Sequence, residues 1–468
     1  MATIPLALAL QSNPGRYPQA STSRQINCYA EPLGDDGKVK LAVYAAAGLG
    51  SFATLTGGGP IRAMLPVGSY LYVVAGRLLF RVDPGGAALQ IGGIPTSGAV
   101  TMARNRAEPL PEIGIVSDGL YYVCQGTTLT QITDADLPPA SSIASLDGYF
   151  ILPGFGGLWY ITTTPDDATQ IDALDFAKAE SNPDAIVRAV SRETELVLLG
   201  AESTEWWQDT GGTFPFSRVQ AASIGCLSAA SVARVERTVA WVAHDRSVRL
   251  MEGYGGKRIS TPPVERTIAA ETNQAAIRGT SWTEPGHVFY ALSGTDWTWV
   301  YDAITDLWHE RQSYGSGRWR VSEVVEFAGK RIAGDAETGL LYELDRDACD
   351  EVGNPLVITN DTPIVHVAPN RLQIDRLLLD VVMGVGLVPG DATTEDPEVT
   401  ISMSRDSGVT FGAERACKIG KDGQRRGRIS ERRWGVVEQQ GAVFRLSASA
   451  AVARAFLSGS LEANKLRP

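Results

Sequence analysis

The sequence has little cysteine and histidine and no long apolar run. Of its 468 residues, five are cysteine and four are histidine. The cysteines lie far apart and form no C-x-x-C pair, which predicts reduced thiols from a cytosolic folding environment. They are Cys28, Cys124, Cys226, Cys349 and Cys417. The apolar stretch from Ile4 to Leu10 is too short to cross a bilayer and follows no Lys or Arg, so we expect no secretory signal, anchor or membrane partner.

The common catalytic motifs are also missing. The sequence contains no G-x-S-x-G elbow, no H-E-x-x-H helix and no G-x-x-x-x-G-K-[ST] loop, and its histidines have no metal-ligand spacing. The glycines at Gly384, Gly386 and Gly390 follow a predicted strand but lead into proline and acidic residues, which indicates a turn and not a phosphate site. We therefore expect a protein that is not an enzyme and needs no cofactor or metal.

The charge balance is acidic. Lys and Arg number 42 against 53 Asp and Glu, a net charge of −11. Such a chain is not attracted as a whole to phosphate backbones or anionic lipid. Its 49 glycines exceed the usual share of about 7% and favour many turns between short strands.

A hairpin-like unit recurs along the first three-quarters of the chain. Each copy has a turn residue, a run of β-branched and aromatic residues, a short break and a second such run. Copies begin near residues 70, 119, 148, 195, 238, 287 and 330, at steps of 49, 29, 47, 43, 49 and 43. Five of these steps suit a four-stranded blade, so the pattern predicts an all-β fold with a β-propeller of six or seven blades. The step of 29 fits either a truncated blade or two hairpins of one blade.

The pattern changes near residue 355. Pro363 and Pro369 interrupt a polar segment, after which longer alternating strands follow. These strands predict a small antiparallel β-sandwich. The predicted domains are an N-terminal extended arm (1–40), the propeller (41–354) and the C-terminal sandwich (355–468).

Two features point weakly to glycan chemistry. The segment from Ser404 to Phe411 resembles the Asp box of sialidases, although it occurs once and outside the predicted propeller. We expect Asp406 to brace a turn, with Gly408 at positive φ and Phe411 packed beneath. The pairs Trp206–Trp207 and Trp297–Trp299 fit sugar-stacking platforms, but their place inside strand runs favours core packing. A propeller that binds or processes glycans remains the alternative function.

A basic segment stands out in this acidic chain. Between Arg405 and Arg433 nine Lys or Arg accompany four Asp or Glu. Its densest part predicts a protein interface, with a solvated loop as the plain alternative and DNA as the weaker partner. The predicted interface residues are Arg425, Arg426, Arg428, Arg432 and Arg433.

Three stretches resemble the tail hub, or packaged-DNA stabilisation, proteins of short-tailed bacteriophages. The opening is similar in its I-P-L start and its R-x-x-N-x-Y-x-E segment, although Ala47 stands where the family has proline. The middle part carries the most specific motifs, and a C-terminal hairpin also recurs. The matching stretches are Ile4–Leu6, Arg24–Glu31, Ala47–Gly48, Phe176–Asp184, Ile186–Val187, Gly200–Trp206, Phe214–Phe216, Gly225–Cys226, Ile259–Thr261 and Ser404–Gly412.

The resemblance implies a structural protein of the virion tail, assembled in the cytoplasm of the bacterial host. It implies a homo-oligomer, a hexameric ring that lies below the portal and its adaptor (the head-to-tail connector) and closes the capsid after DNA packaging. The implied partners also include a tail needle or plug and tailspikes or tail fibres. Such a ring encloses the path of double-stranded DNA without binding it specifically. No site residue carries over from the resemblance.

Overall fold

The protein is almost entirely β-structure. Its computed structural model describes residues 2–34 and 39–467. These residues form two compact units: unit 1 comprises the described residues of 1–50, 296–319 and 344–468, and unit 2 comprises residues 51–295 and 320–343. The predicted all-β class is confirmed, and the arm, propeller and sandwich boundaries at 40 and 354 stay a prediction.

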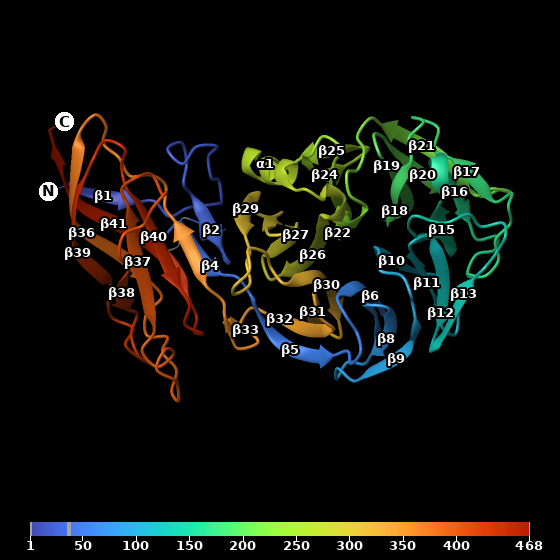
Figure 1. Cartoon of the computed structure of the whole chain (residues 1–468), viewed down its shortest axis with the longest axis horizontal. Coiled ribbons are helices and arrows are strands. Elements are labelled where there is room, and N and C mark those ends of the chain that lie inside the picture. Colours follow the sequence, from blue (N-terminus) through green and yellow to red (C-terminus); the bar gives the residue numbers. More distant parts are fainter. Residues whose placement is uncertain (1, 35–38, 468) are drawn as a thin grey trace. The chain divides into compact units, whose positions relative to one another are not determined.

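Unit 2 is built from antiparallel sheets of four strands, coloured blue to yellow in Figure 1. Five sheets lie wholly within it. They are β6 (Ile61–Val67), β7 (Tyr70–Ala75), β8 (Leu78–Val82) and β9 (Ala88–Gly93); β10 (Val100–Arg104), β11 (Glu112–Ser117), β12 (Leu120–Gln125) and β13 (Thr128–Ile132); β14 (Ala144–Leu146), β15 (Tyr149–Pro153), β16 (Leu158–Ile161) and β17 (Phe176–Lys178); β18 (Ile186–Arg192), β19 (Glu195–Gly200), β20 (Thr204–Asp209) and β21 (Phe216–Ala222); and β22 (Ala233–Val235), β23 (Thr238–Val242), β24 (Val248–Glu252) and β25 (Gly255–Arg258).

Two further sheets begin in unit 2. One starts with β26 (Arg278–Glu284) and β27 (His287–Ser293); the other has the order β30 (Val321–Phe327), β31 (Lys330–Asp335), β32 (Leu340–Asp345) and β5 (Gly48–Thr54). Strand β5 precedes all the others of unit 2 in the sequence, yet it belongs to the last sheet. The Leu55 N–H donates to the carbonyl of Gly339 at 2.8 Å just beyond β5.

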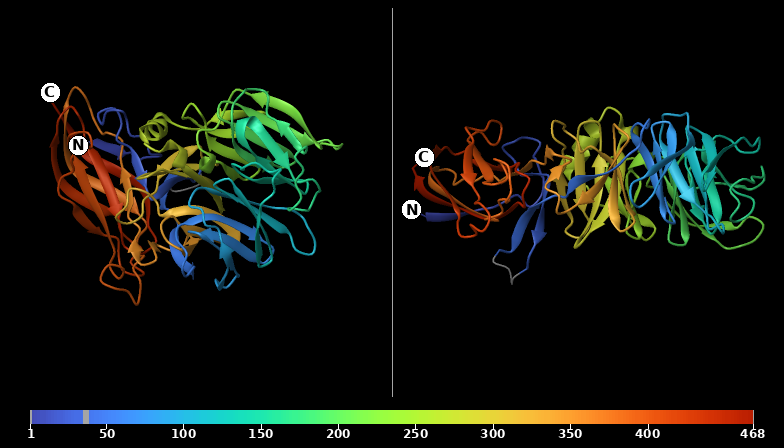
Figure 2. Two further views of the ribbon diagram at one scale, coloured as in Figure 1. Left: turned by 45° about the vertical axis from the view of Figure 1, so that its right-hand side comes forward. Right: turned by 90° about the horizontal axis from the view of Figure 1, so that it is seen from below.

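The first strands of the seven sheets form a closed ring. Strands β6, β10, β14 and β18 contact one another in that order, as do β22, β26 and β30, and β30 contacts β6. Between β18 and β22, apolar side chains that include Val190 and Val232 share one cluster. Unit 2 is therefore a propeller of seven blades, and two views of its sheets are given in Figure 2.

The short step of 29 residues has a simple cause. The hairpin at 119 joins the second and third strands of its blade, β11 and β12, whereas the hairpin at 148 joins the first and second, β14 and β15. Both turns are Asp-Gly with positive φ at both residues, a combination suited to a tight hairpin. The two hairpins thus belong to separate blades, and the blade is not truncated.

Large aromatic side chains fill the space between blades. Trp159 of one blade is fully buried and meets Trp207 of the next with ring centroids 5.1 Å apart. Phe214 and Phe216 contact the same indole edge-on. Edge-to-face aromatic packing contributes about 0.5–1.5 kcal/mol per pair beyond area burial.

Unit 1 holds the C-terminal strands in two sheets. One has the order β28 (Thr298–Asp302), β29 (Leu307–Glu310), β2 (Arg24–Ile26), β35 (Ile358–Asp361), β40 (Val443–Ala448), β37 (Glu398–Ser404) and β38 (Arg415–Lys418). The other has the order β3 (Cys28–Pro32), β4 (Leu41–Ala45), β41 (Ala455–Leu466), β36 (Arg371–Val381) and β39 (Ile429–Val437), with β1 (Ala2–Leu6) also paired to β41. Short strands β33 (Asp350–Glu351) and β34 (Asn354–Pro355) pair with each other.

Alternating side chains from the two sheets of unit 1 share one apolar core. Leu377 of β36, Ile401 of β37 and Phe444 of β40 are all fully buried in it. This is the sandwich that the alternating pattern predicts. The N-terminal residues also take part, since β1 pairs with β41 from Ala2 opposite Ala463 to Leu6 opposite Gly459.

Helical structure is scarce. The described residues contain one α-helix, α1 (Pro262–Ala270), which begins at a proline whose fixed φ suits the first helical turn. Within residues 2–34 and 39–467, no helix combines the length and the apolar character that crossing a membrane requires.

Candidate functional site

The five arginines predicted as an interface lie on the surface of unit 1. Arg425, Arg426 and Arg428 are in the loop that leads from β38 to β39, and Arg432 and Arg433 are on β39. All five are exposed. Because β38 and β39 belong to different sheets, this loop connects the two sheets of the sandwich.

Internal ion pairs already neutralise part of the basic segment. Lys418 lies 2.7 Å from Glu398, and Lys421 lies 2.8 Å from Glu395. The Arg428 Nε is 2.6 Å from an Asp380 oxygen, and this hydrogen bond raises the pKa of Arg428. Arg428 is therefore already paired within the chain, unlike the other four arginines of the predicted interface.

Four arginines of the predicted set keep free guanidinium groups. Side chains of Arg425, Arg426, Arg432 and Arg433 form no ion pair or hydrogen bond with the residues that the structure describes. We call these four the arginine edge. Exposed, unpaired cations retain their full attraction for an acidic neighbour, since no internal contact must be broken.

A β-bulge holds part of the arginine edge. Arg433 has φ of +65° and Gly435 has φ of +81°, where the pairing of β39 with β36 shifts register. The Arg415 guanidinium donates to the carbonyls of Arg432 and Arg433 at 2.5 and 3.0 Å. The same guanidinium stacks over the Trp434 ring at 3.9 Å. The backbone below the two arginines is thus fixed by local contacts.

The Asp-box-like segment is a braced turn. The Thr410 N–H donates to Asp406 at 2.9 Å, and the Ser404 hydroxyl lies 2.6 Å from the same carboxylate. Gly408 has φ of +81°, as predicted. The hydrogen bond from Ser404, followed by those from Thr410, lowers the pKa of Asp406 to about 2. Phe411 lies 3.9 Å below the Arg445 guanidinium.

The tryptophan pairs fill cores. Trp206, Trp207 and Trp299 are buried, and Trp297 is half-buried. A buried indole presents no face to a sugar, so these residues act in packing, as the strand pattern favours.

A polar cavity lies on the axis of the propeller. It has a volume of about 660 Å³ and is lined by residues from all seven first strands of unit 2. Its charged lining residues are Arg104, Arg106, Arg188, Arg234, Asp147, Glu193 and Glu323. The sequence pattern did not predict them; the signal it offered was a charged residue within a first strand, such as Arg188 in β18.

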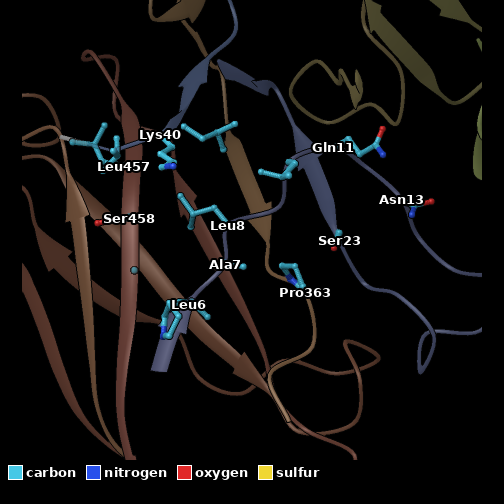
Figure 3. A pocket seen from close by; sticks show the side chains of 15 residues that line it. Leu6, Ala7, Leu8, Gln11, Asn13, Ser23, Lys40, Pro363, Leu457 and Ser458 are labelled. Carbon is cyan, nitrogen blue, oxygen red and sulfur yellow. The ribbon is translucent and has the colours of Figure 1, made fainter. Parts of the chain in front are cut away.

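A second, apolar cavity of about 540 Å³ lies in unit 1 (Figure 3). Leu6, Leu8 and Leu457 line it together with Pro363, and Lys40 stands at its edge. The N-terminal residues thus pack along the sandwich, and several of their leucines face this cavity.

No metal centre is present in residues 2–34 and 39–467, because no group of three or more His, Cys, Asp or Glu side chains converges there. A seven-bladed propeller and a sandwich, with buried tryptophans and an exposed arginine edge, define a protein of all-β class.

Family comparisons place the chain more narrowly. The family described as bacteriophage P22 Gp10, beta-propeller, matches residues 37–349, and that described as bacteriophage P22 Gp10, beta-sandwich, matches residues 358–464. The chain belongs to this family, the tail hub or DNA-stabilisation proteins of short-tailed phages. It is therefore a structural protein of a bacteriophage virion.

Solved structures share only general features with the chain. BamB from Moraxella catarrhalis is 11% identical, with 73% of this chain and 97% of that chain covered, at a TM-score of 0.40. The Neurospora crassa Pan2 WD40 domain is 8% identical, with 64% and 95% covered, at 0.41. Virginiamycin B lyase from Staphylococcus aureus is 10% identical, with 62% and 97% covered, at 0.43. No curated protein matches the sequence significantly.

Proposed function

We propose that the protein is a non-enzymatic tail hub that forms a hexameric ring below the portal adaptor and closes the capsid after DNA packaging. In this role it also attaches the needle or plug and the tailspikes or fibres. The observation that carries the proposal is the match of residues 37–349 and 358–464, in order, to the propeller and sandwich of one phage family.

The arginine edge supports a docking role for the sandwich. In a chain of net charge −11, four unpaired arginines on one surface loop and strand are an uncommon concentration of positive charge. Complementary charge at an interface speeds encounter and fixes register more than it adds affinity. We propose that the arginine edge meets an acidic surface of the adaptor or another tail protein.

The features that pointed to glycan chemistry have structural roles. Asp406 braces a turn, and the tryptophans pack in cores. These placements favour the structural proposal over a glycan-processing propeller.

An assembly assay tests the proposal. Purified protein mixed with adaptor-bearing portal complexes should give a stable complex with six copies per portal, while the protein alone should associate weakly. A cyclic interface closes best on a template that aligns its copies. Mass photometry and negative-stain images measure the stoichiometry. A tight dimer that forms without the adaptor and is unchanged when the adaptor is added would contradict the proposal.

A further inference from the structure

The axial cavity of the propeller carries more positive than negative charge. Arg106 is 3.8 Å from Asp147, and Arg278, the first residue of β26, lies 3.3 Å from Glu323. After these pairs, Arg104, Arg188 and Arg234 face the cavity together with the single carboxylate of Glu193. The cavity is thus locally cationic in an acidic chain.

Arg188 is the least satisfied of these groups. Its Nε is buried and has no hydrogen-bond partner, and its guanidinium makes no ion pair with the residues that the structure describes. Burial lowers the pKa of Arg188, because the surrounding protein replaces the water that would solvate its charge. The residue as a whole is half-buried, and Nε is its one fully buried nitrogen without a partner among the described residues. A guanidinium has five N–H donors and no acceptor, so a buried donor left unsatisfied is costly.

Arg62 shows what a purely structural arginine looks like in the same propeller. Its Nε donates to the Gly98 carbonyl at 2.9 Å, and its Nη1 donates to the carbonyls of Gly76 and Thr96 at 2.9 and 3.0 Å. Its Nη2 reaches the Ser117 hydroxyl at 2.7 Å. Arg188 has none of these contacts, although it too lies near the start of a first strand.

Glu323 does not supply the missing partner. Arg188 and Glu323 occupy equivalent positions, each the first paired residue beyond a β-bulge, and they interact electrostatically. The Glu323 Oε2, however, accepts from the Met64 N–H at 3.0 Å and from Arg278. Bulges commonly aim side chains toward functional sites.

We propose that Arg188 binds an oxyanion, a phosphate or a carboxylate group, inside the axial cavity. The planar fork of a guanidinium matches two oxygens of either group, and charge-assisted bonds of this kind are about twice as strong as neutral ones. A volume of about 660 Å³ is ample for an ion with part of a larger molecule attached. This proposal does not depend on ring assembly.

The test uses the full chain in chloride buffer at fixed ionic strength. Inorganic phosphate and citrate are titrated separately, with binding followed by calorimetry and stability followed by thermal unfolding. The wild-type protein and the control Arg77→Gln, which removes an exposed arginine outside the cavity, should bind at least one anion and unfold at higher temperature in its presence. Arg188→Gln should bind at least tenfold more weakly. A response to phosphate alone points to a phosphoryl ligand, and one to citrate alone points to a carboxylate.

Stability without the anion separates a binding role from a structural one. Because Arg188 forms no hydrogen bond or ion pair with the residues that the structure describes, Arg188→Gln in chloride should unfold at the same temperature as wild type or higher. A variant that fails to fold, or that unfolds well below wild type, would show that Arg188 holds the propeller together and would overturn the proposal. So would a wild-type protein that binds neither anion, or an Arg188→Gln variant that binds as tightly as wild type.

Discussion

At the scale of single residues, the fold buries most of its cysteine thiols. Cys28, Cys124, Cys226 and Cys417 are buried and Cys349 is half-buried, all as free thiols. Burial raises the pKa of Cys28, Cys226 and Cys417 to about 12 and that of Cys124 to about 11. Such thiols are poor nucleophiles at neutral pH because the thiolate is the reactive form.

Thiol labelling should therefore report the fold directly. We expect Ellman's reagent to react slowly with Cys349 and not with the four buried cysteines in the native protein at pH 8. All five should react at once in denaturant. Rapid reaction of two or more thiols in the native state would contradict the buried placement.

The Asp406 turn has a defined pH dependence. Its folded pKa of about 2 lies below the ordinary value of 3.8, so the carboxylate contributes stability that is present above pH 4 and is lost as pH falls toward 2. Asp406→Asn should lower the urea midpoint of the sandwich at pH 7, with the difference from wild type shrinking between pH 4 and pH 2. A difference that is constant over this range would show that the charge is irrelevant.

At the scale of elements, the hydrophobic runs predict the inner strands well and the outer strands poorly. Second strands such as β7 and β19 are buried along almost their whole length because they are enclosed between blades. Outer strands such as β9 and β13 are mostly exposed, so their sequences carry no apolar pattern to detect. The pairing of β5 with β32 could not be predicted either. Alternation of apolar and polar residues shows which side of a strand is buried, but it does not identify a partner strand nearly 300 residues away.

The candidate functional site, too, could be predicted from the sequence only in part. Exposure of the arginine edge follows from composition, since so many like charges in one basic, glycine-bearing segment are too costly to bury together. The pairing of Arg428 with Asp380 could not be predicted, because the two strands meet only through the register of β36 and β39. The cationic cavity arises only when seven first strands converge.

Ring closure depends on close packing between the last blade and the first. A Cβ added at Gly334 of β31 would lie 2.5 Å from the Ile61 Cγ2 of β6. Gly334→Ala should destabilise the propeller by about 1–3 kcal/mol, the usual cost of overpacking a core. Gly93→Ala is the control, because its added Cβ meets nothing closer than 3.9 Å. Equal midpoints for the two variants in urea unfolding would contradict this account of the closure.

At the scale of the whole molecule, the net charge predicts that the proposed ring does not hold DNA by its phosphates. Each chain carries −11, and counterion release is available only at small basic patches such as the arginine edge. The isolated protein should show no binding to duplex DNA at physiological salt in a filter or anisotropy assay. Binding with a steep salt slope that Arg425→Glu/Arg426→Glu abolishes would instead assign the arginine edge to DNA.

Docking should respond to the arginine edge alone. Arg425→Glu/Arg426→Glu should weaken binding to adaptor-bearing portals at least tenfold without changing the unfolding midpoint, because neither side chain forms an ion pair or hydrogen bond with a residue that the structure describes. The control Arg77→Glu/Arg237→Glu makes the same charge change at exposed positions of unit 2. Equal loss in both double variants would mean that net charge and not this surface decides docking.

Genome retention tests the proposed hub most directly. Freshly packaged heads that carry portal and adaptor are incubated with the purified protein, and the fraction of genome resistant to DNase is measured against the number of bound copies. The proposed closure predicts that protection rises steeply as bound copies approach six per portal. Heads that bind a full complement and still lose their DNA to the nuclease would contradict it.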